Sequence, residues 1–320
     1  MKKCIAILCA ALMVLSMAAC SGGEKADDGK YTVGICQLVT HDALDAATQG
    51  FQDALIEALG EENVTFDLQN AAGDSNTCAS IATAFVSADV DLIMANATPA
   101  LQAASAATAD IPVLGTSVTE YGVALDIENF DGTVGGNVSG TSDLAPLTEQ
   151  AAMLQEWFPD ASYVGLLYCS AEANSKYQVD TVKALLEEMG YTCELFAFAD
   201  SNDMAAVTQA ACDYSDVIYV PTDNAVASGT DVIDGICRPA GVPIIAGEEG
   251  ICSGCGVATL SISYYDLGVA TGKMAAKILT GETDIAEMPI EYAADVTPKY
   301  NAEICADLGL TPPDGYEAIG

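Results

Sequence analysis

One order of apolar runs, polar loops and amphipathic stretches occurs twice in this chain, and it restricts the possible fold more than any other feature. The first copy opens with the apolar run 33–39 and the polar loop 40–42. Apolar residues then follow at spacings of three and four, which predicts an amphipathic helix; they are Leu44, Ala47, Phe51, Leu55 and Leu59. We place the N-cap of this helix at Asp42, with Asp45 as the acid of a capping box, and its end at Gly60.

The rest of the first copy continues the alternation. Further strands are expected at 64–68, 90–95 and 111–115, and helices at 77–87 and from Pro99 to about Ala107. Strands that alternate with helices are typical of a parallel, doubly wound sheet.

The second copy repeats this order. Strands are expected at 163–168, 193–198, 216–220 and 242–246, with a helix at 175–189. The glycine- and serine-rich segment 132–146 is interpreted as the junction between the copies. A further helix at 264–279 and an extended segment at 289–292 suggest that the chain crosses between the two halves more than once.

These patterns predict an α/β fold with two doubly wound parallel-sheet lobes joined by a hinge. We expect the first lobe to contain residues 31–143 and 264–292. The second lobe would contain residues 144–263 and 293–320.

The first thirty residues have the pattern of a targeting segment. Lys2 and Lys3 precede the apolar stretch 5–15, and small residues lead to Cys20. We expect a signal peptide at 1–19, lipidation of Cys20, and a flexible tether over 20–30. The apolar stretch is too short for a convincing membrane span.

Charge and cysteine content limit the partners. The formal net charge of −36 argues against nucleic acid and against anionic lipid surfaces. Twelve cysteines are present; without Cys4, Cys9 and the lipidated Cys20, nine remain, so at least one cannot pair within the chain. A single C-x-x-C, Cys252 to Cys255, has no nearby histidine, so we expect no metal site.

The motifs of common enzyme classes are absent from the sequence. There is one histidine, His41, and no G-x-S-x-G elbow surrounds a strand-ending serine. No phosphate-binding loop or dinucleotide fingerprint follows the first strand. We therefore expect neither enzymatic activity nor a cofactor.

Polar residues at the predicted strand ends favour binding instead, because ligands of open parallel sheets lie beyond the carboxyl ends of the strands. The expected ligand-binding residues are His41, Asp42, Thr98, Thr116, Ser117, Ser170, Glu172, Asn174, Ser175, Asp223 and Glu248. Hydroxyls and carboxylates without lysine or arginine suit a zwitterionic amino acid, although a sugar or nucleoside remains an alternative. For the ligand's ammonium group we favour Asp223 or Glu172, with Asp42 and Glu248 next.

The motifs resemble one protein family in their order and spacing. They are residues 40–45, 97–100, 136–140, 142–143, 170–175, 220–224, 248–250, 264–268 and 272–275. Together they resemble the extracytoplasmic substrate-binding lipoproteins of ABC transporters, of the type I periplasmic-binding-protein fold. The subgroup that they resemble includes the tryptophan and tyrosine transporter binding proteins.

The resemblance implies three hinge crossings, a ligand cleft between the lobes and an aromatic amino acid as ligand. It also implies a monomer that is lipid-anchored outside the cell membrane and delivers its ligand to an ABC permease and ATPase complex. A sensory receptor subunit without transport is the alternative from a different functional class.

Overall fold

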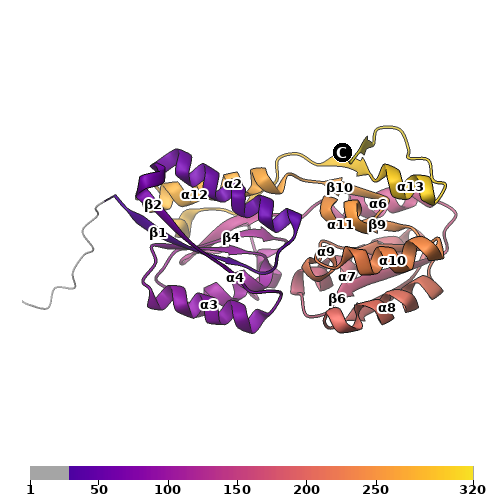
Figure 1. Ribbon diagram of the computed structural model, residues 1–320, viewed down its shortest axis with the longest axis horizontal. Helices are drawn as coiled ribbons and strands as arrows, with labels where there is room; N and C mark the ends of the chain where they lie inside the picture. Colours follow the sequence, from indigo (N-terminus) through magenta and orange to yellow (C-terminus); the bar gives the residue numbers. More distant parts are fainter. Residues whose placement is uncertain (1–28, 320) are drawn as a thin grey trace, which may run out of the picture. The chain divides into compact units, whose positions relative to one another are not determined.

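The computed structural model describes residues 29–319. The expected signal peptide 1–19, Cys20 and most of the tether lie outside the described residues. The residues from Tyr31 onward form a single compact unit, and Figure 1 labels its helices and strands.

Thirteen strands of the described residues form two sheets. The first sheet has the order β11-β5-β4-β3-β1-β2, and all its pairings are parallel. Its strands are β1 (Tyr31–Gln37), β2 (Val64–Asn70), β3 (Leu92–Asn96), β4 (Val113–Val118), β5 (Val138–Ser142) and β11 (Glu291–Tyr292).

The second sheet has the order β13-β12-β10-β9-β8-β6-β7, and only β10 and β12 pair antiparallel. Its strands are β6 (Tyr163–Cys169), β7 (Thr192–Phe198), β8 (Val217–Val220), β9 (Ile244–Ala246), β10 (Ala258–Ser261), β12 (Thr297–Tyr300) and β13 (Glu317–Ala318). The first five strands of each half are thus arranged in the same spatial order, which confirms the predicted duplication.

Helices connect these strands. They are α2 (Asp42–Leu59), α3 (Ser75–Ser87), α4 (Thr98–Ala107), α5 (Tyr121–Ala124), α6 (Leu147–Trp157), α7 (Ala173–Glu188), α8 (Ser201–Tyr214), α9 (Asn224–Ala227), α10 (Thr230–Ala240), α11 (Glu249–Cys255), α12 (Tyr264–Leu279) and α13 (Ala302–Asp307). Short 3-10 turns occupy Glu61–Asn63 and Ile285–Glu287.

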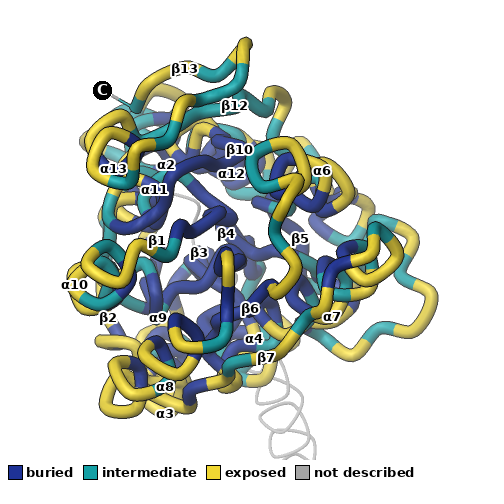
Figure 2. The backbone as a smooth tube through the Cα atoms, turned by 90° about the vertical axis from the view of Figure 1, so that its right-hand side faces the viewer, coloured by how far each residue is buried: buried dark blue, intermediate teal, exposed yellow. Residues whose placement is uncertain are grey.

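Each face of the first sheet is covered by a helix pair, as Figure 1 shows. Phe51 of α2 and Met274 of α12 pack on one face. Phe85 of α3 and Leu101 of α4 pack on the other. Burial of each such side chain stabilises the fold by roughly 1.5–3 kcal/mol. The sandwiched strands are buried on both faces, and Figure 2 shows β3 and β4 in the colour of buried residues.

The α2–α12 crossing depends on glycine. A Cβ atom built on Gly50 would lie 2.1 Å from the Tyr265 carbonyl oxygen, and one on Gly268 would lie 2.0 Å from the Ala47 carbonyl oxygen. The two backbones are therefore in direct contact at these positions. This contact attaches α12, from late in the sequence, to the first sheet.

Three sequence predictions need correction. Asp42 is the first residue of α2 rather than its cap; His41 is the N-cap residue, and its side chain makes no capping hydrogen bond. The segment 132–146 is more than a junction, because it contains β5, a strand of the first sheet. Thr116 and Ser117 lie inside β4 rather than in the loop after it.

The chain passes between the sheets three times: after β5, after β10 and after β11. These three passages agree with the hinge crossings that the resemblance implies. Sheet membership also supports the lobe limits given above, which stay a proposal.

Candidate functional site

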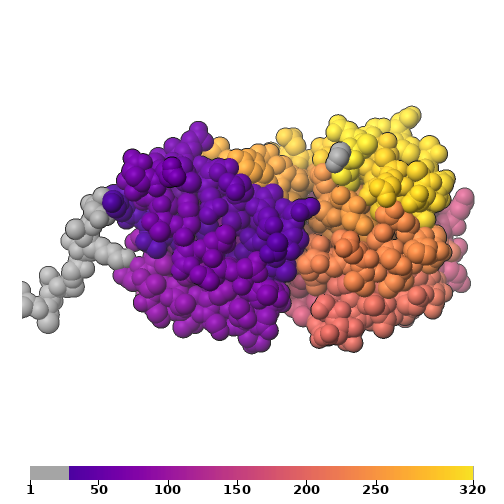
Figure 3. All heavy atoms as spheres, in the orientation of Figure 1, coloured from indigo at the N-terminus to yellow at the C-terminus, as the bar shows by residue number. Residues whose placement is uncertain are grey.

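The carboxyl ends of the strands in the two sheets face one another, and one contact joins them directly. His41, which follows β1, lies with its Nε2 atom 3.2 Å from Oδ1 of Asn224, which follows β8. Figure 3 shows the indigo and purple atoms of the first lobe against orange atoms of the second. Burial lowers the pKa of His41, which favours the neutral imidazole. Because the partner atom is an amide oxygen, Nε2 is the nitrogen that carries the hydrogen and donates it.

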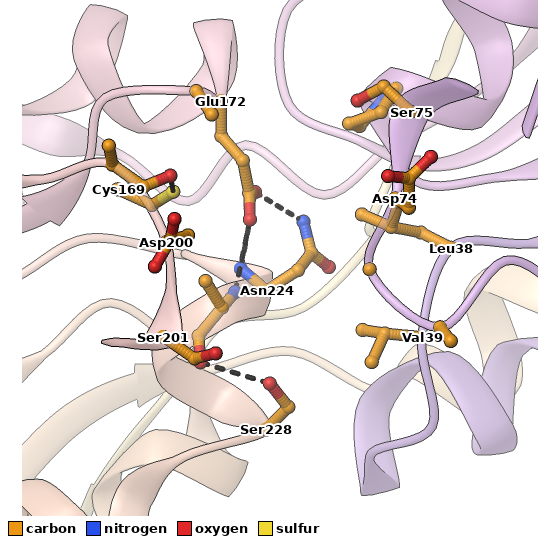
Figure 4. Close-up of a pocket in the computed structure, with 16 residues that line it drawn as sticks. Leu38, Val39, Asp74, Ser75, Cys169, Glu172, Asp200, Ser201, Asn224 and Ser228 are labelled. Carbon is orange, nitrogen blue, oxygen red and sulfur yellow. Dashed lines mark hydrogen bonds between the residues drawn. The ribbon is translucent and has the colours of Figure 1, made fainter. Parts of the chain in front are cut away.

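Two cavities flank this contact. One, of about 290 Å³, is lined from the first lobe by residues such as Leu38 and Ser75 and from the second by Glu172 and Asn224. Figure 4 shows these two groups of side chains facing each other across the cavity. The other, of about 380 Å³, is lined by His41 and Asp42 together with residues of the second lobe.

Glu172 organises the second-lobe side of the first cavity. Its Oε2 accepts hydrogen bonds from the Asn224 side chain at 2.7 Å and from Asn174 Nδ2 at 3.2 Å. Its Oε1 accepts from the Ala225 backbone N–H at 3.0 Å. Burial, and then the charge of Asp223, raise the pKa of Glu172 to about 7. Because Asn224 also contacts His41, one hydrogen-bonded chain runs from the Glu172 carboxylate across to the first lobe.

Two other predicted acids have their oxygens occupied by backbone N–H groups. Asp223 caps α9, accepting from Cys169 N at 2.7 Å and from Val226 N at 2.9 Å. Glu248 caps α11, accepting from Gly250 N at 2.6 Å and from Ile251 N at 2.5 Å. Both carboxylates are buried. These contacts give Asp223 a local structural role, so its role toward a ligand stays a prediction.

Burial raises the pKa of Glu248 to about 7, and the charges of Asp143 and Glu249 add to the shift. A carboxyl group whose pKa is higher in the folded than in the unfolded state stabilises the fold when it is protonated. That stability is complete below the unfolded pKa of about 4.3 and is lost as pH rises toward 7.

We therefore expect the melting temperature to decrease as the pH rises from about 4.5 to about 7.5. Glu248→Gln should reduce this slope, because glutamine does not titrate. Thermal melts across this range measure both proteins. A slope in the variant equal to that of the parent would contradict the assignment to Glu248.

Buried polar atoms without a hydrogen-bond partner mark a second group of side chains. Among the described residues this group includes Thr98 Oγ1, Ser117 Oγ, Asp143 Oδ1 and Asn174 Oδ1. An unsatisfied buried polar atom costs roughly 1–3 kcal/mol, so each needs an explanation. All four lie at strand carboxyl ends or at the first turn of the following helix, which is where a ligand of this fold class would satisfy them.

Backbone strain occurs at the same place. Ser117 has φ 53°, and Ala97, immediately before Thr98, has φ 90°. Non-glycine residues in this region cost on the order of 1–3 kcal/mol each and cluster at ligand sites. The strain supports a functional role for Thr98 and Ser117.

Asp143, like Asn224, is absent from the ligand-binding residues that the sequence predicts. It directly follows β5; its Oδ2 accepts from the Tyr264 hydroxyl at 3.0 Å, and Oδ1 has no partner. Burial raises the pKa of the carboxyl. A linker interpretation of 132–146 concealed it, whereas recognition of 138–142 as a strand would have placed Asp143 at a strand end.

The remaining predicted residues make local contacts or are exposed. Thr116 Oγ1 lies 3.2 Å from Thr141 Oγ1 in the core, and Ser170 donates to the Phe198 carbonyl. Ser175 is buried and accepts from Asn174 at 3.3 Å. Asp42 is exposed on the first turn of α2.

Residues 29–319 contain no group of three or more histidine, cysteine, aspartate or glutamate residues arranged to hold a metal ion. Within the same range no helix is both long and apolar enough to cross a membrane.

Comparison with known proteins places this site in context. Residues 32–316 match the family model described as ABC transporter substrate binding protein. The chain is 34% identical over 305 residues to a tyrosine-binding protein of Clostridioides difficile strain R20291, covering 90% of this chain and 87% of that protein.

Two solved structures are similar over the whole fold. One is described as the ABC domain in complex with L-Trp from Streptococcus pneumonia: TM-score 0.85, 33% identity, 91% of this chain and 100% of that chain. The other is the ligand-free, open structure of a substrate-binding protein with adhesive properties from Clostridium difficile. It has a TM-score of 0.68 and 37% sequence identity, and the match covers 90% of this chain and 99% of that chain.

At similar sequence identity, the fold superposes better on the L-Trp complex than on the open structure. The direct contact between His41 and Asn224 across the two lobes accords with this difference. The predicted family and fold are confirmed: this chain has the type I periplasmic-binding-protein fold and belongs to the ABC transporter substrate-binding protein family.

Proposed function

We propose that this protein binds an aromatic amino acid between its two lobes and delivers it to an ABC importer. The observation that carries this proposal is a group of four among the buried, unpaired polar atoms at the strand ends: the hydroxyls of Thr98 and Ser117, one carboxylate oxygen of Asp143 and the amide oxygen of Asn174. Together they offer partners for both charged groups of a zwitterion.

The two hydroxyls suit the ligand's carboxylate. Thr98 is the first residue of α4, a helix of ten residues whose N-terminus carries partial positive charge. Ser117 lies in the neighbouring strand β4, which pairs with β3 immediately before α4. Hydroxyl donors beside a helix N-terminus stabilise an anion without a lysine or arginine.

The free oxygen of Asp143 suits the ligand's ammonium group. A buried ammonium needs an acid partner, because an unpaired buried charge costs several kcal/mol. The other buried acids, Glu172, Asp223 and Glu248, already accept two or more hydrogen bonds from the protein. Asp143 therefore becomes the favoured partner, ahead of the sequence-based choice of Asp223.

The assignment of an aromatic side chain to the ligand depends on similar proteins. A relative at 34% identity is named a tyrosine-binding protein, and a structure at 33% identity holds L-Trp. Sugar-binding structures of the same fold share only 13–16% identity with this chain and support the fold alone.

A thermal-shift screen of amino acids, sugars and nucleosides tests the ligand class. A ligand at a hundred times its dissociation constant stabilises the folded state by about 2.7 kcal/mol, which is readily measured as a higher melting temperature. We expect L-tyrosine or L-tryptophan to give the largest shift. A shift with sugars or nucleosides alone would overturn the amino-acid assignment.

The anchor is a separate proposal. Members of this family act outside the cytoplasm, and we propose that a lipid on Cys20 holds this one, as a monomer, at the membrane. Cys20→Ser removes the thiol to which this lipid would be attached, so the variant should move from the membrane to the soluble fraction. Unchanged membrane retention in a fractionation experiment would contradict lipidation.

His41 is expected to act by holding the lobes together. Removing one hydrogen bond of this kind costs about 0.5–1.5 kcal/mol, so His41→Ala should weaken ligand binding roughly 2- to 10-fold. The melting temperature of the ligand-free protein should hardly change. Glu57→Ala, at an exposed position of α2 that lines neither cavity, is the matched control. Calorimetry and melts that showed lost stability with unchanged affinity would instead assign His41 a structural role.

A further inference from the structure

Two cysteines of the second lobe lie in contact. Cys212 of α8 and Cys237 of α10 are 25 residues apart in the sequence, and their Sγ atoms are 3.0 Å apart. Both belong to the core that these helices share. All nine cysteines of the described residues are free thiols, so this pair is reduced in the structure.

The geometry needs only a small change to form a bond. A disulfide has an S–S distance of about 2.05 Å, so the two sulfur atoms must approach by roughly 1 Å. A family that acts outside the cytoplasm also works where disulfides persist.

We propose that Cys212 and Cys237 form a disulfide when the protein meets a small-molecule disulfide oxidant. Cys212 is 8% exposed and Cys237 is 1% exposed, so Cys212 is the one that an oxidant can reach first. The hydrogen bond from Cys237 also lowers the pKa of Cys212, which favours the nucleophilic thiolate.

The reaction proceeds by two exchanges. The Cys212 thiolate attacks one sulfur of the small disulfide and releases one thiolate, which takes up a proton. The Cys237 thiol then loses its proton, attacks Cys212 Sγ in the mixed disulfide and releases the second thiol. The two cysteines lose two electrons and two protons, and the small disulfide is reduced to two thiols.

The cross-link would fasten one lobe without joining it to the other. Both α8 and α10 belong to the second lobe, and their first residues, Ser201 and Thr230, line the two cavities described above. The bond would therefore hold the second-lobe wall of the cleft while leaving movement between the lobes free. Cys36 and Cys78 form a second hydrogen-bonded thiol pair, but both are fully buried.

Oxidised glutathione, added to the purified, fully reduced protein, tests the proposal. After denaturation, alkylation and digestion without reductant, we expect a peptide pair linked through Cys212 and Cys237. We also expect a melting temperature about 6–12 °C above that of the reduced protein. Cys193→Ser is the matched control, because Cys193 is the most exposed cysteine among residues 29–319 and lies outside the pair, and this variant should keep the shift.

The double variant Cys212→Ser/Cys237→Ser should lose the shift. If that variant fails to fold, peptide mapping of the parent decides alone. Alkylation of both Cys212 and Cys237 after oxidation would overturn the proposal. A stable glutathione adduct on Cys212 beside a free Cys237 would also overturn it.

Discussion

Asp143→Asn is expected to weaken amino-acid binding by two to four orders of magnitude. Removing one partner of a buried charge pair costs on the order of 3–5 kcal/mol, and each 1.4 kcal/mol is a factor of ten in affinity. Asparagine keeps the shape of the side chain and its contact with the Tyr264 hydroxyl, and it removes only the charge. The loss should therefore come from the ligand's ammonium group.

The same variant should fold at least as well as the parent. Burial raises the pKa of Asp143, which means that the ligand-free fold disfavours the charged carboxylate. We expect an unchanged or higher melting temperature in the absence of ligand. Tyr264→Phe is a suitable control, because it removes the hydrogen bond to Oδ2 and leaves the Asp143 charge in place.

Calorimetric titration of the parent and both variants measures these effects. If Asp143→Asn binds as tightly as the parent, the ammonium site is elsewhere. Glu172→Gln and Asp223→Asn are then the next variants to test, because both acids are buried on the second-lobe side.

Gly268→Ala is expected to destabilise the protein by roughly 3 kcal/mol, at the upper end of the range for overpacking. The new methyl group would lie 2.0 Å from the Ala47 carbonyl oxygen. A backbone atom cannot rotate away, so α2 and α12 must separate and lose part of their shared core with the first sheet.

Gly235→Ala provides the matched control. Gly235 also lies within a helix, α10, but a Cβ atom there would meet nothing within 4 Å. Alanine in such a position stabilises by about 0.4–1 kcal/mol, so the two substitutions should shift the melting temperature in opposite directions. Equal shifts in the melting temperatures of the two variants would contradict the close packing of α2 against α12.

Much of the fold could be predicted because hydrophobic periodicity is local. The helix pattern at 264–279 matches α12 in the structure, and strands such as 163–168 differ from β6 by one residue. The repeated order of elements predicted both sheets. The strand β5 was missed because its sequence, Val138 to Ser142, is mostly small and polar, and only pairing with β4 and β11 makes it a strand.

The site was harder to predict, because the choice of ligand-binding residues depends on which polar atoms remain unpaired after folding. Sequence position placed Asp223 and Glu248 at strand ends, but it could not show that their oxygens cap α9 and α11. Nor could it show that Asp143 keeps one oxygen free, since that depends on the position of Tyr264, more than a hundred residues away. His41 was placed correctly in a loop facing the other lobe, but its hydrogen bond to Asn224 is a tertiary contact.

We propose above that the cleft between the lobes binds an aromatic amino acid. Calorimetric titration of the purified protein with L-tyrosine and L-tryptophan, beside D-glucose and adenosine as comparison ligands, tests it most directly. We expect saturable binding of one amino acid per protein molecule, the loss of this binding in Asp143→Asn, and no saturable binding of the sugar or nucleoside. Saturable binding of glucose or adenosine, with no binding of either amino acid, would contradict it.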